Sequence, residues 1–199
     1  MGVLFFVYYA VEPSRSSSLW YTNIFPMFPL EIKVPHTNIL GRQMILPDLG
    51  REGQERLKRA RVGIVGAGGL GCPIALYLAN AGIGFLKIID SDKVEESNLH
   101  RQVLHTVQSI GELKVVSAQR ELLARNSSVC VEACGERIDL SNIERILGDV
   151  DVVVDGSDNM PTRYLLNDYC IVFHKVRFPN NFVKRFLASN RSIINRTNG

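Results

Sequence analysis

The sequence VGIVGAGGLG, residues 62–71, decides the fold of this chain together with LKIID, residues 86–90. The apolar, β-branched residues in each stretch are typical of buried parallel strands. Between the two stretches, Gly66, Gly68 and Gly71 have the spacing G-x-G-x-x-G. This spacing allows a tight turn, a close approach of the backbone to a phosphate, and close packing of a helix on a strand. We therefore expect a strand, a glycine loop, a helix and a second strand.

The residues after the glycine loop support a nucleotide-binding unit. Apolar side chains recur there at a helical spacing, at Ile74, Leu76, Tyr77, Leu78 and Ala81. A helix that begins at the loop directs its N–H groups and the positive end of its dipole toward an anion. Asp90, 19 residues after Gly71, ends the second strand, where a carboxylate can accept hydrogen bonds from ribose hydroxyls. This unit alone does not distinguish NAD, FAD and ATP, and a glycine turn in an ordinary α/β protein is the alternative.

Strands and helices are expected to alternate along the chain. The predicted strands are 61–65, 85–90, 129–133 and 150–155, and the predicted helices are 50–58, 70–81, 112–126, 142–147 and 161–173, with a helical turn at 98–102. This alternation predicts an α/β fold with a doubly wound, mostly parallel, Rossmann-like sheet and a ligand at the carboxyl ends of its strands. Residues 176–199 show no clear period.

Several short motifs accompany the glycine loop: RQMILP (42–47), GAGGLGCP (66–73), DSD (90–92), SNLHRQVLH (97–105), GELK (111–114) and SDN (157–159). Together these motifs are more specific than a glycine loop alone. They resemble those of the ThiF/MoeB-type adenylyltransferases, relatives of the ubiquitin-activating enzymes. Within this family they are most similar to those of the eukaryotic adenylyltransferases and sulfurtransferases. The resemblance covers residues 42–175.

The resemblance implies an enzyme that uses ATP and Mg²⁺ to adenylylate the C-terminal glycine of a ubiquitin-like sulfur-carrier protein. Such carriers serve molybdenum cofactor synthesis, thiamine synthesis or tRNA thiolation. The attacking group is a carboxylate, already ionised at neutral pH, so no general base is required. Negative charge builds on the phosphate oxygens, so fixed cations are the expected catalytic device. The resemblance further implies a homodimer in the cytoplasm.

The resemblance assigns catalytic roles to four residues. Arg101 and Lys114 are expected to face the phosphates, and Asp158 to lie near the metal or the reacting phosphate. Arg42 is expected to reach the phosphates bound by the neighbouring subunit. Three of these residues also have a simpler interpretation. Arg101 would be a solvated charge, Lys114 a surface lysine, and Asp158 the N-cap of the helix from Pro161.

The residues expected to bind the nucleotide form a larger set. Asp90 takes the ribose, Asn98 holds the phosphate region, and Gly69 lines the nucleotide. The full set is Gly66, Gly68, Gly69, Gly71, Asp90, Asn98, Arg101, Lys114, Asp158 and Asn159. His100 and His105 are expected to be structural, since no carboxylate or cysteine pairs with them in the sequence.

Composition limits the functional classes. A chain of 199 residues with 46% apolar residues can form one medium-sized domain with a core. A net charge of +3 is too small and too scattered to predict a nucleic-acid partner. The apolar stretch at residues 3–11 is too short to span a bilayer and lacks the features of a signal peptide, so no membrane association is expected.

The four cysteines predict free thiols in a reducing compartment. Cys72, Cys130, Cys134 and Cys170 form no C-x-x-C pair, so no zinc site is expected. Cys72 is expected to pack as a small apolar residue behind the glycine loop. Zinc is expected in the family, but its ligand cysteines have no counterpart here.

The domain boundaries follow from the extent of the resemblance. Residues 1–38 are expected to be a disordered leader, 39–175 a partial ThiF-type domain, and 176–199 a tail unrelated to the family. The C-terminal part of the family's domain, with its further sheet and zinc motifs, is therefore expected to be missing. Two other functions stay open: a truncated, non-catalytic nucleotide-binding or dimerisation module, and an NAD-dependent oxidoreductase.

Overall fold

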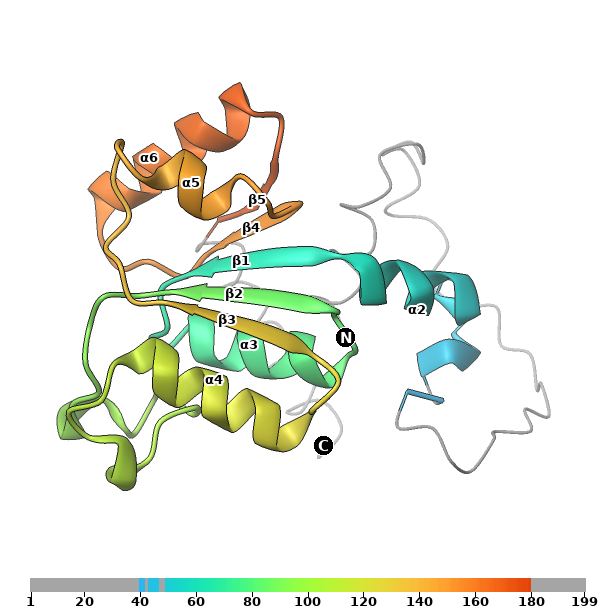
Figure 1. Ribbon diagram of the computed structural model, residues 1–199, viewed down its shortest axis with the longest axis horizontal. Helices are drawn as coiled ribbons and strands as arrows, with labels where there is room; N and C mark the ends of the chain where they lie inside the picture. The colour runs from blue at the N-terminus through green and yellow to red at the C-terminus, as the bar shows by residue number, and fades with distance from the viewer. Residues whose placement is uncertain (1–39, 42, 47–48, 180–199) are drawn as a thin grey trace, which may run out of the picture.

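The computed structural model describes residues 40–41, 43–46 and 49–179. Its centre is a five-stranded parallel sheet in the order β3-β2-β1-β4-β5 (Figure 1). The strands are β1 (Arg61–Val65), β2 (Phe85–Ile89), β3 (Cys130–Cys134), β4 (Val152–Asp155) and β5 (Val176–Phe178). The predicted α/β, doubly wound, Rossmann-like sheet is confirmed.

Helices cover both faces of the sheet. They are α2 (Gly50–Arg59), α3 (Gly71–Asn80), α4 (Lys114–Arg125), α5 (Ile143–Leu147) and α6 (Met160–Val172), with 3-10 turns η2 (Gln43–Ile45), η3 (Glu96–Asn98) and η4 (Val107–Ser109). Figure 1 shows α3 and α4 on one face and α5 and α6 on the other. The predicted helices and strands are all present, with bounds that differ by at most two residues. The helical turn predicted at residues 98–102 is found as η3, which begins two residues earlier and ends at Asn98.

Each face of the sheet has its own core. Ile64 and Leu86 belong to a buried cluster that also contains residues of α3 and α4, including Leu78. Val65 and Val153 belong to a second cluster with α5 and α6. The strands of a parallel sheet must be apolar on both faces because helices cover both, and this explains the continuous apolar runs in the sequence.

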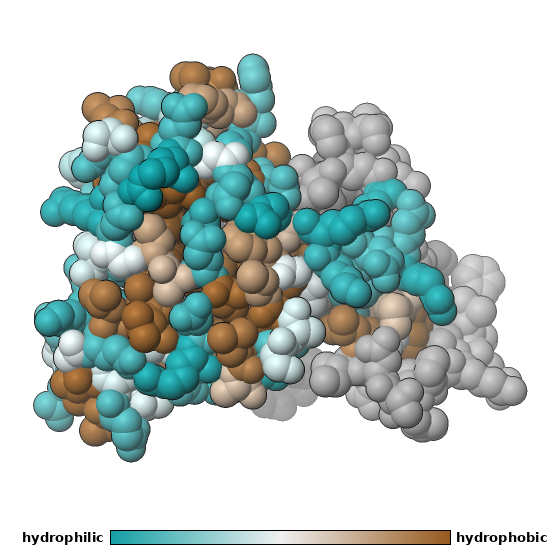
Figure 2. All heavy atoms as spheres, viewed as in Figure 1, coloured by the Kyte–Doolittle hydropathy of each residue, from teal (hydrophilic) through white to brown (hydrophobic). Residues whose placement is uncertain are grey.

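Helix α2 lies at the end of the sheet opposite the glycine loop. Leu57 and Gln54 are buried, whereas the visible surface over α2 is hydrophilic (Figure 2). Among the residues that the structure describes, no helix is long and apolar enough to cross a membrane.

Strand β5 was not predicted from the sequence, because it lies in the stretch that shows no clear period. Three residues are too few to show a period, and their register comes from parallel pairing with β4, with Val152 opposite Val176. An ion pair fixes this pairing: Arg177 Nη2 lies 2.6 Å from Asp155 Oδ2, and the Asp155 side chain is fully buried. The carboxyl ends of the adjacent strands β1 and β4, from which the chain continues to helices on opposite faces of the sheet, form the switch point at which such folds bind ligands.

Candidate functional site

The glycine loop joins β1 to α3 and packs against the turn after β4. Gly66 has a φ of +98°, a conformation that favours glycine, and a Cβ there would lie 2.8 Å from the backbone of Gly156. A Cβ on Gly71 would lie 1.7 Å from the carbonyl oxygen of Gly66. Neither position can accept a side chain. Leu70 provides no side-chain cap for α3, so a ligand can satisfy the first N–H groups of the helix.

Asp90 is tied to the glycine loop. Its Oδ2 accepts a hydrogen bond from the Ala67 N–H at 2.7 Å, and its Oδ1 accepts one from the Asp92 N–H at 2.8 Å. The carboxylate therefore has a fixed position at the carboxyl end of β2, beside the loop. Each oxygen retains a lone pair for a further donor, as the predicted ribose contact requires.

One cavity of about 580 Å³ brings most of the predicted residues together. Its volume lies in the range of small-molecule sites. The predicted residues that line it are Gly66, Gly68, Gly69, Asp90, Asn98, Arg101, Lys114 and Asp158. Gly71 packs behind the loop instead, Asn159 lines an adjoining cavity, and Arg42 lies outside the described residues.

Lys114 is not the surface lysine of the simpler reading. It is 7% exposed, and its Nζ donates a hydrogen bond to Asp92 Oδ2 at 2.9 Å. Burial disfavours the charged form, but the hydrogen bond with Asp92 and the charges of Asp90 and Asp158 outweigh it, so the pKa of Lys114 is raised. The side chain therefore carries a fixed positive charge at neutral pH.

Arg101 lies over the glycine loop. A Cβ built on Gly69 would be 3.5 Å from Cγ and Cδ of Arg101, so the arginine stem covers that glycine. The guanidinium donates a hydrogen bond to the side-chain oxygen of Asn98, whose Nδ2 donates to Glu95 Oε2 at 3.2 Å. Asn98 thus orients Arg101, and the exposed guanidinium faces the cavity.

The turn after β4 separates the roles of two neighbouring residues. The predicted N-cap role of Asp158 is wrong: the cap is Asn159, whose Oδ1 accepts a hydrogen bond from the Thr162 N–H at 3.0 Å. The reason is that α6 begins at Met160, one residue before the predicted start. Asp158 is exposed and lines both cavities.

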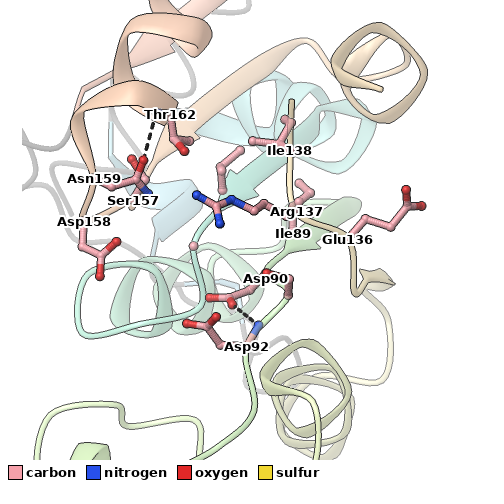
Figure 3. Close-up of a pocket in the computed structure, with 13 residues that line it drawn as sticks. Ile89, Asp90, Asp92, Glu136, Arg137, Ile138, Ser157, Asp158, Asn159 and Thr162 are labelled. Atoms are coloured by element: carbon pink, nitrogen blue, oxygen red, sulfur yellow. Dashed lines mark hydrogen bonds between the residues drawn. The ribbon is translucent and has the colours of Figure 1, made fainter. Parts of the chain in front are cut away.

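The adjoining cavity of about 340 Å³ shares Gly66, Asp90, Asp92, Ser157 and Asp158 with the first. In Figure 3, Arg137 extends from the segment after β3 toward the turn that carries Ser157 and Asn159. The carboxylates of Asp90 and Asp92 lie below the centre of the view, and that of Asp158 lies at the left. The two cavities form adjacent parts of one site along the carboxyl edge of the sheet.

Sequence reasoning missed several polar residues of the larger cavity, among them Arg163 and Gln102. Arg163 Nη2 donates to the carbonyl oxygen of Ser157 at 3.0 Å. Arg163 Nε and Gln102 Oε1 are buried and have no hydrogen-bond partner within the described part of the chain. The only sequence signal for Arg163 was its position one helical turn after Asn159, and Gln102 had none beyond its place in the SNLHRQVLH motif.

His105 corrects another expectation. It is buried, and its Nε2 lies 3.6 Å from Cys72 Sγ, so a cysteine does pair with it. The pairing joins residues 33 positions apart and was not visible in the sequence. Cys72 is fully buried in the core behind the loop, as expected. His100 is exposed beside Arg101.

The four cysteines are free thiols. Within the described ranges, no group of three or more His, Cys, Asp or Glu side chains is placed to hold a metal ion. The larger cavity offers the glycine loop, three cations and four separate carboxylates, a set of groups that suits a phosphate ligand accompanied by a metal ion.

Two curated proteins share much of this sequence. A sulfur carrier protein adenylyltransferase of Thermus thermophilus is 54% identical over 134 residues, which are 67% of this chain and 49% of that protein. The adenylyltransferase and sulfurtransferase MOCS3 of Drosophila willistoni is 53% identical over 134 residues, which are 67% of this chain and 29% of that protein. The chain thus spans at most about half the length of these curated relatives.

The fold is also similar to that of a solved structure. The crystal structure of E. coli MccB with ATP has a TM-score of 0.65 and 30% identity, covering 72% of this chain and 46% of that one. The ThiF family matches residues 40–184, a range that includes β5 and extends past residue 175, where the sequence reading placed the end of the family's domain. This match covers well over half of the chain, and the chain therefore belongs to the ThiF family.

Proposed function

We propose that the chain binds ATP in the larger cavity and adenylylates the C-terminal glycine of a ubiquitin-like sulfur-carrier protein. The observation that carries this proposal is the convergence of the glycine loop, Arg101 and Lys114 on one cavity. Relatives about half identical to this chain are named for the same activity. Molybdenum cofactor synthesis and tRNA thiolation are the proposed pathways, and the cytoplasm is the proposed location.

The residues present fit a nucleoside triphosphate. The glycine loop presents backbone where side chains would collide, as phosphate cradles do. Asp90 is fixed where it can accept hydrogen bonds from the ribose. The buried, unpartnered Gln102 Oε1 and Arg163 Nε are polar atoms that a ligand or its water can satisfy.

The chemistry requires charge stabilisation rather than proton transfer. The carrier's carboxylate attacks the α-phosphorus, a new P–O bond forms, and the bond from the α-phosphorus to pyrophosphate breaks. Arg101 and Lys114 would stabilise the charge that develops on the phosphate oxygens. Because the pKa of Lys114 is raised, its ammonium stays charged through neutral pH.

Mg²⁺ is proposed to arrive with the nucleotide. Mg²⁺ is usually held by one or two carboxylates together with substrate phosphates and water. Asp158, exposed at the junction of the two cavities, and Asp92 are the carboxylates that could hold it. When bound, the metal would neutralise part of the phosphate charge.

Arg42 is proposed to act across a homodimer. The neighbouring Gln43 donates a hydrogen bond to the carbonyl oxygen of Ala81 at 2.8 Å, at the C-terminal end of α3. The glycine loop lies at the opposite end of this helix, and ten helical residues span about 15 Å. Gln43 is thus anchored at the end of α3 that lies away from the cavity. Arg42 itself lies outside the described residues, so its proposed role at the partner's site rests on its place in the RQMILP motif.

Carrier-dependent exchange of labelled pyrophosphate into ATP tests the proposal. Arg101→Ala should slow exchange by roughly 10²–10³-fold, the typical cost of one lost transition-state donor. Arg125→Ala, at the exposed end of α4, is the matched control and should exchange at the parent rate.

Three outcomes of this test distinguish the alternatives. Equal exchange by Arg101→Ala and Arg125→Ala would refute the catalytic assignment. ATP binding by the parent chain without exchange would indicate a non-catalytic nucleotide-binding module. Preference for NAD over ATP in competition would indicate an oxidoreductase.

A further inference from the structure

A buried histidine lies directly behind the glycine loop. His105 is 5% exposed and lies between the loop and α4. Its Nε2 is 3.0 Å from the carbonyl oxygen of Ala67, and its Nδ1 is 3.1 Å from Ser117 Oγ. The third neighbour is Cys72 Sγ, which donates to the same Ala67 oxygen at 3.1 Å. Every polar atom of the ring therefore has a partner.

These partners determine the tautomer of His105. A carbonyl oxygen can only accept, so Nε2 must carry the proton that faces Ala67. Nδ1 then accepts the hydrogen bond from the Ser117 hydroxyl at 3.1 Å, because the other acceptor near this hydroxyl, the carbonyl oxygen of Leu104, is farther away at 3.4 Å. The neutral, Nε2-protonated ring satisfies both contacts, whereas the other neutral tautomer would place two lone pairs 3.0 Å apart.

The contact with Ala67 links His105 to the nucleotide site. The Ala67 N–H donates to Asp90, and the Ala67 carbonyl accepts from His105 and Cys72. The residue at the centre of the glycine loop is thus held on both sides. Movement of the loop would break contacts to three parts of the fold: the end of β2 at Asp90, helix α3 at Cys72, and the segment that contains His105.

A nucleophilic role for the Cys72–His105 pair does not fit this geometry. Cys72 has no exposed surface, and burial raises the pKa of its thiol to about 11. The Nε2 proton faces Ala67 instead of leaving a lone pair for the thiol. A reactive cysteine needs an accessible thiolate with a lowered pKa, so the pair is structural.

We propose that His105 is a positioning residue that, as the neutral Nε2-protonated tautomer, holds the glycine loop in the conformation that binds ATP. The inference rests on the proposed nucleotide site. The charged groups around the ring are Lys114 from α4 and Asp90 from the end of β2, with the neutral Cys72 thiol from α3. Burial and Lys114 disfavour the protonated ring, and Asp90 favours it.

Two variants of His105 separate positioning from packing. Glutamine places an amide N–H near the position of Nε2, whereas asparagine places its amide near Nδ1 and cannot reach Ala67. His105→Asn should weaken ATP binding about tenfold, the equivalent of one hydrogen bond of about 1.4 kcal/mol. His105→Gln should bind ATP within about threefold of the parent, with both variants compared at matched fractions folded. Equal losses in the two variants would overturn the proposal.

Nuclear magnetic resonance of the unliganded chain supplies a second test that does not depend on ATP. The ¹⁵N shifts of His105 should show a protonated Nε2 and an unprotonated Nδ1 at pH 7.5. The Ala67 amide should exchange with solvent faster in His105→Asn than in His105→Gln. The opposite tautomer, or equal exchange rates in the two variants, would refute the inference about His105. A parent chain that bound no ATP would refute the proposed function alone, and this second test could still be carried out on it.

Discussion

Lys114→Met is expected to separate the catalytic function of the site from the stability of the fold. Lys114 is 7% exposed and its stem is packed, so methionine fills a similar volume without the charge. Its ion-pair partner, Asp92, has a side chain that is 68% exposed and can return to water when the ammonium is lost. The pair should therefore contribute no more than about 1 kcal/mol to stability.

The expected loss of activity is much larger. Lys114 is a fixed cation in the cavity, and removing one such group costs about 10²–10³-fold in rate, or about 2.7–4 kcal/mol. Carrier-dependent ATP–pyrophosphate exchange measures the loss of activity, and urea unfolding measures the loss of stability. The ratio of the two effects, not either value alone, identifies Lys114 as a functional residue.

Lys87→Met is the matched control. Lys87 is 5% exposed in β2, and its Nζ binds Asp149 at 2.7 Å and the carbonyl oxygen of Ile146 at 3.1 Å, away from the cavity. Its loss should cost about 1–3 kcal/mol of stability with exchange per folded molecule unchanged. If Lys114→Met retained exchange within about threefold, or lost as much stability as Lys87→Met, the reasoning would be refuted.

Three further outcomes are expected. Gly71→Ala should prevent folding, because its Cβ would lie 1.7 Å from a carbonyl oxygen, whereas Gly69→Ala has no contact under 3.5 Å and should stay within about 0.5 kcal/mol of the parent in thermal unfolding. Burial lowers the pKa of His105, so the unfolded chain binds this proton more readily than the folded chain. The neutral ring of His105 should therefore contribute fully to stability above about pH 6.5, and this contribution should fall as the pH drops toward the folded-state pKa. Urea unfolding at a series of pH values should show a weaker decline in His105→Gln than in the parent. Asn159→Ala should lose about 1 kcal/mol with its helix cap, whereas Asp158→Asn should keep the parent's stability and slow exchange.

Local sequence signals predicted most of the fold. The unit from β1 to β2 is encoded by glycine spacing and by apolar periods, and its predicted bounds agree closely with the structure. Strand β5 was not predictable in this way. Its three residues pair with β4, more than twenty positions earlier, and its anchor is the contact between Arg177 and the buried Asp155. No local pattern records a pairing of that kind.

The same distinction applies to the site. Arg101 and Lys114 were found because they stand in motifs that the family shares, and the structure brings both to the cavity. Gln102, Arg163 and the partners of His105 were not found, because their significance comes from burial and from contacts made across the fold. A sequence shows which residues carry charge; it does not show which polar atoms folding leaves without a partner.

The charges of the larger cavity predict that a divalent cation controls nucleotide binding. Three cations, Arg101, Lys114 and Arg163, face four carboxylates, Asp90, Asp92, Glu95 and Asp158. Such a cavity does not attract a bare triphosphate through its net charge. A metal-bound triphosphate carries less negative charge and gives the spare carboxylates a partner.

Removal of the metal should therefore weaken ATP binding at least tenfold. Isothermal titration of the parent chain with ATP, in Mg²⁺ and then in EDTA, measures this effect. AMP serves as the control, because it lacks the β- and γ-phosphates and its affinity should change little. If ATP bound equally well in EDTA, the acidic residues would have no metal to hold, and the proposed role of Asp158 would have to be abandoned while the glycine loop could still bind a nucleotide.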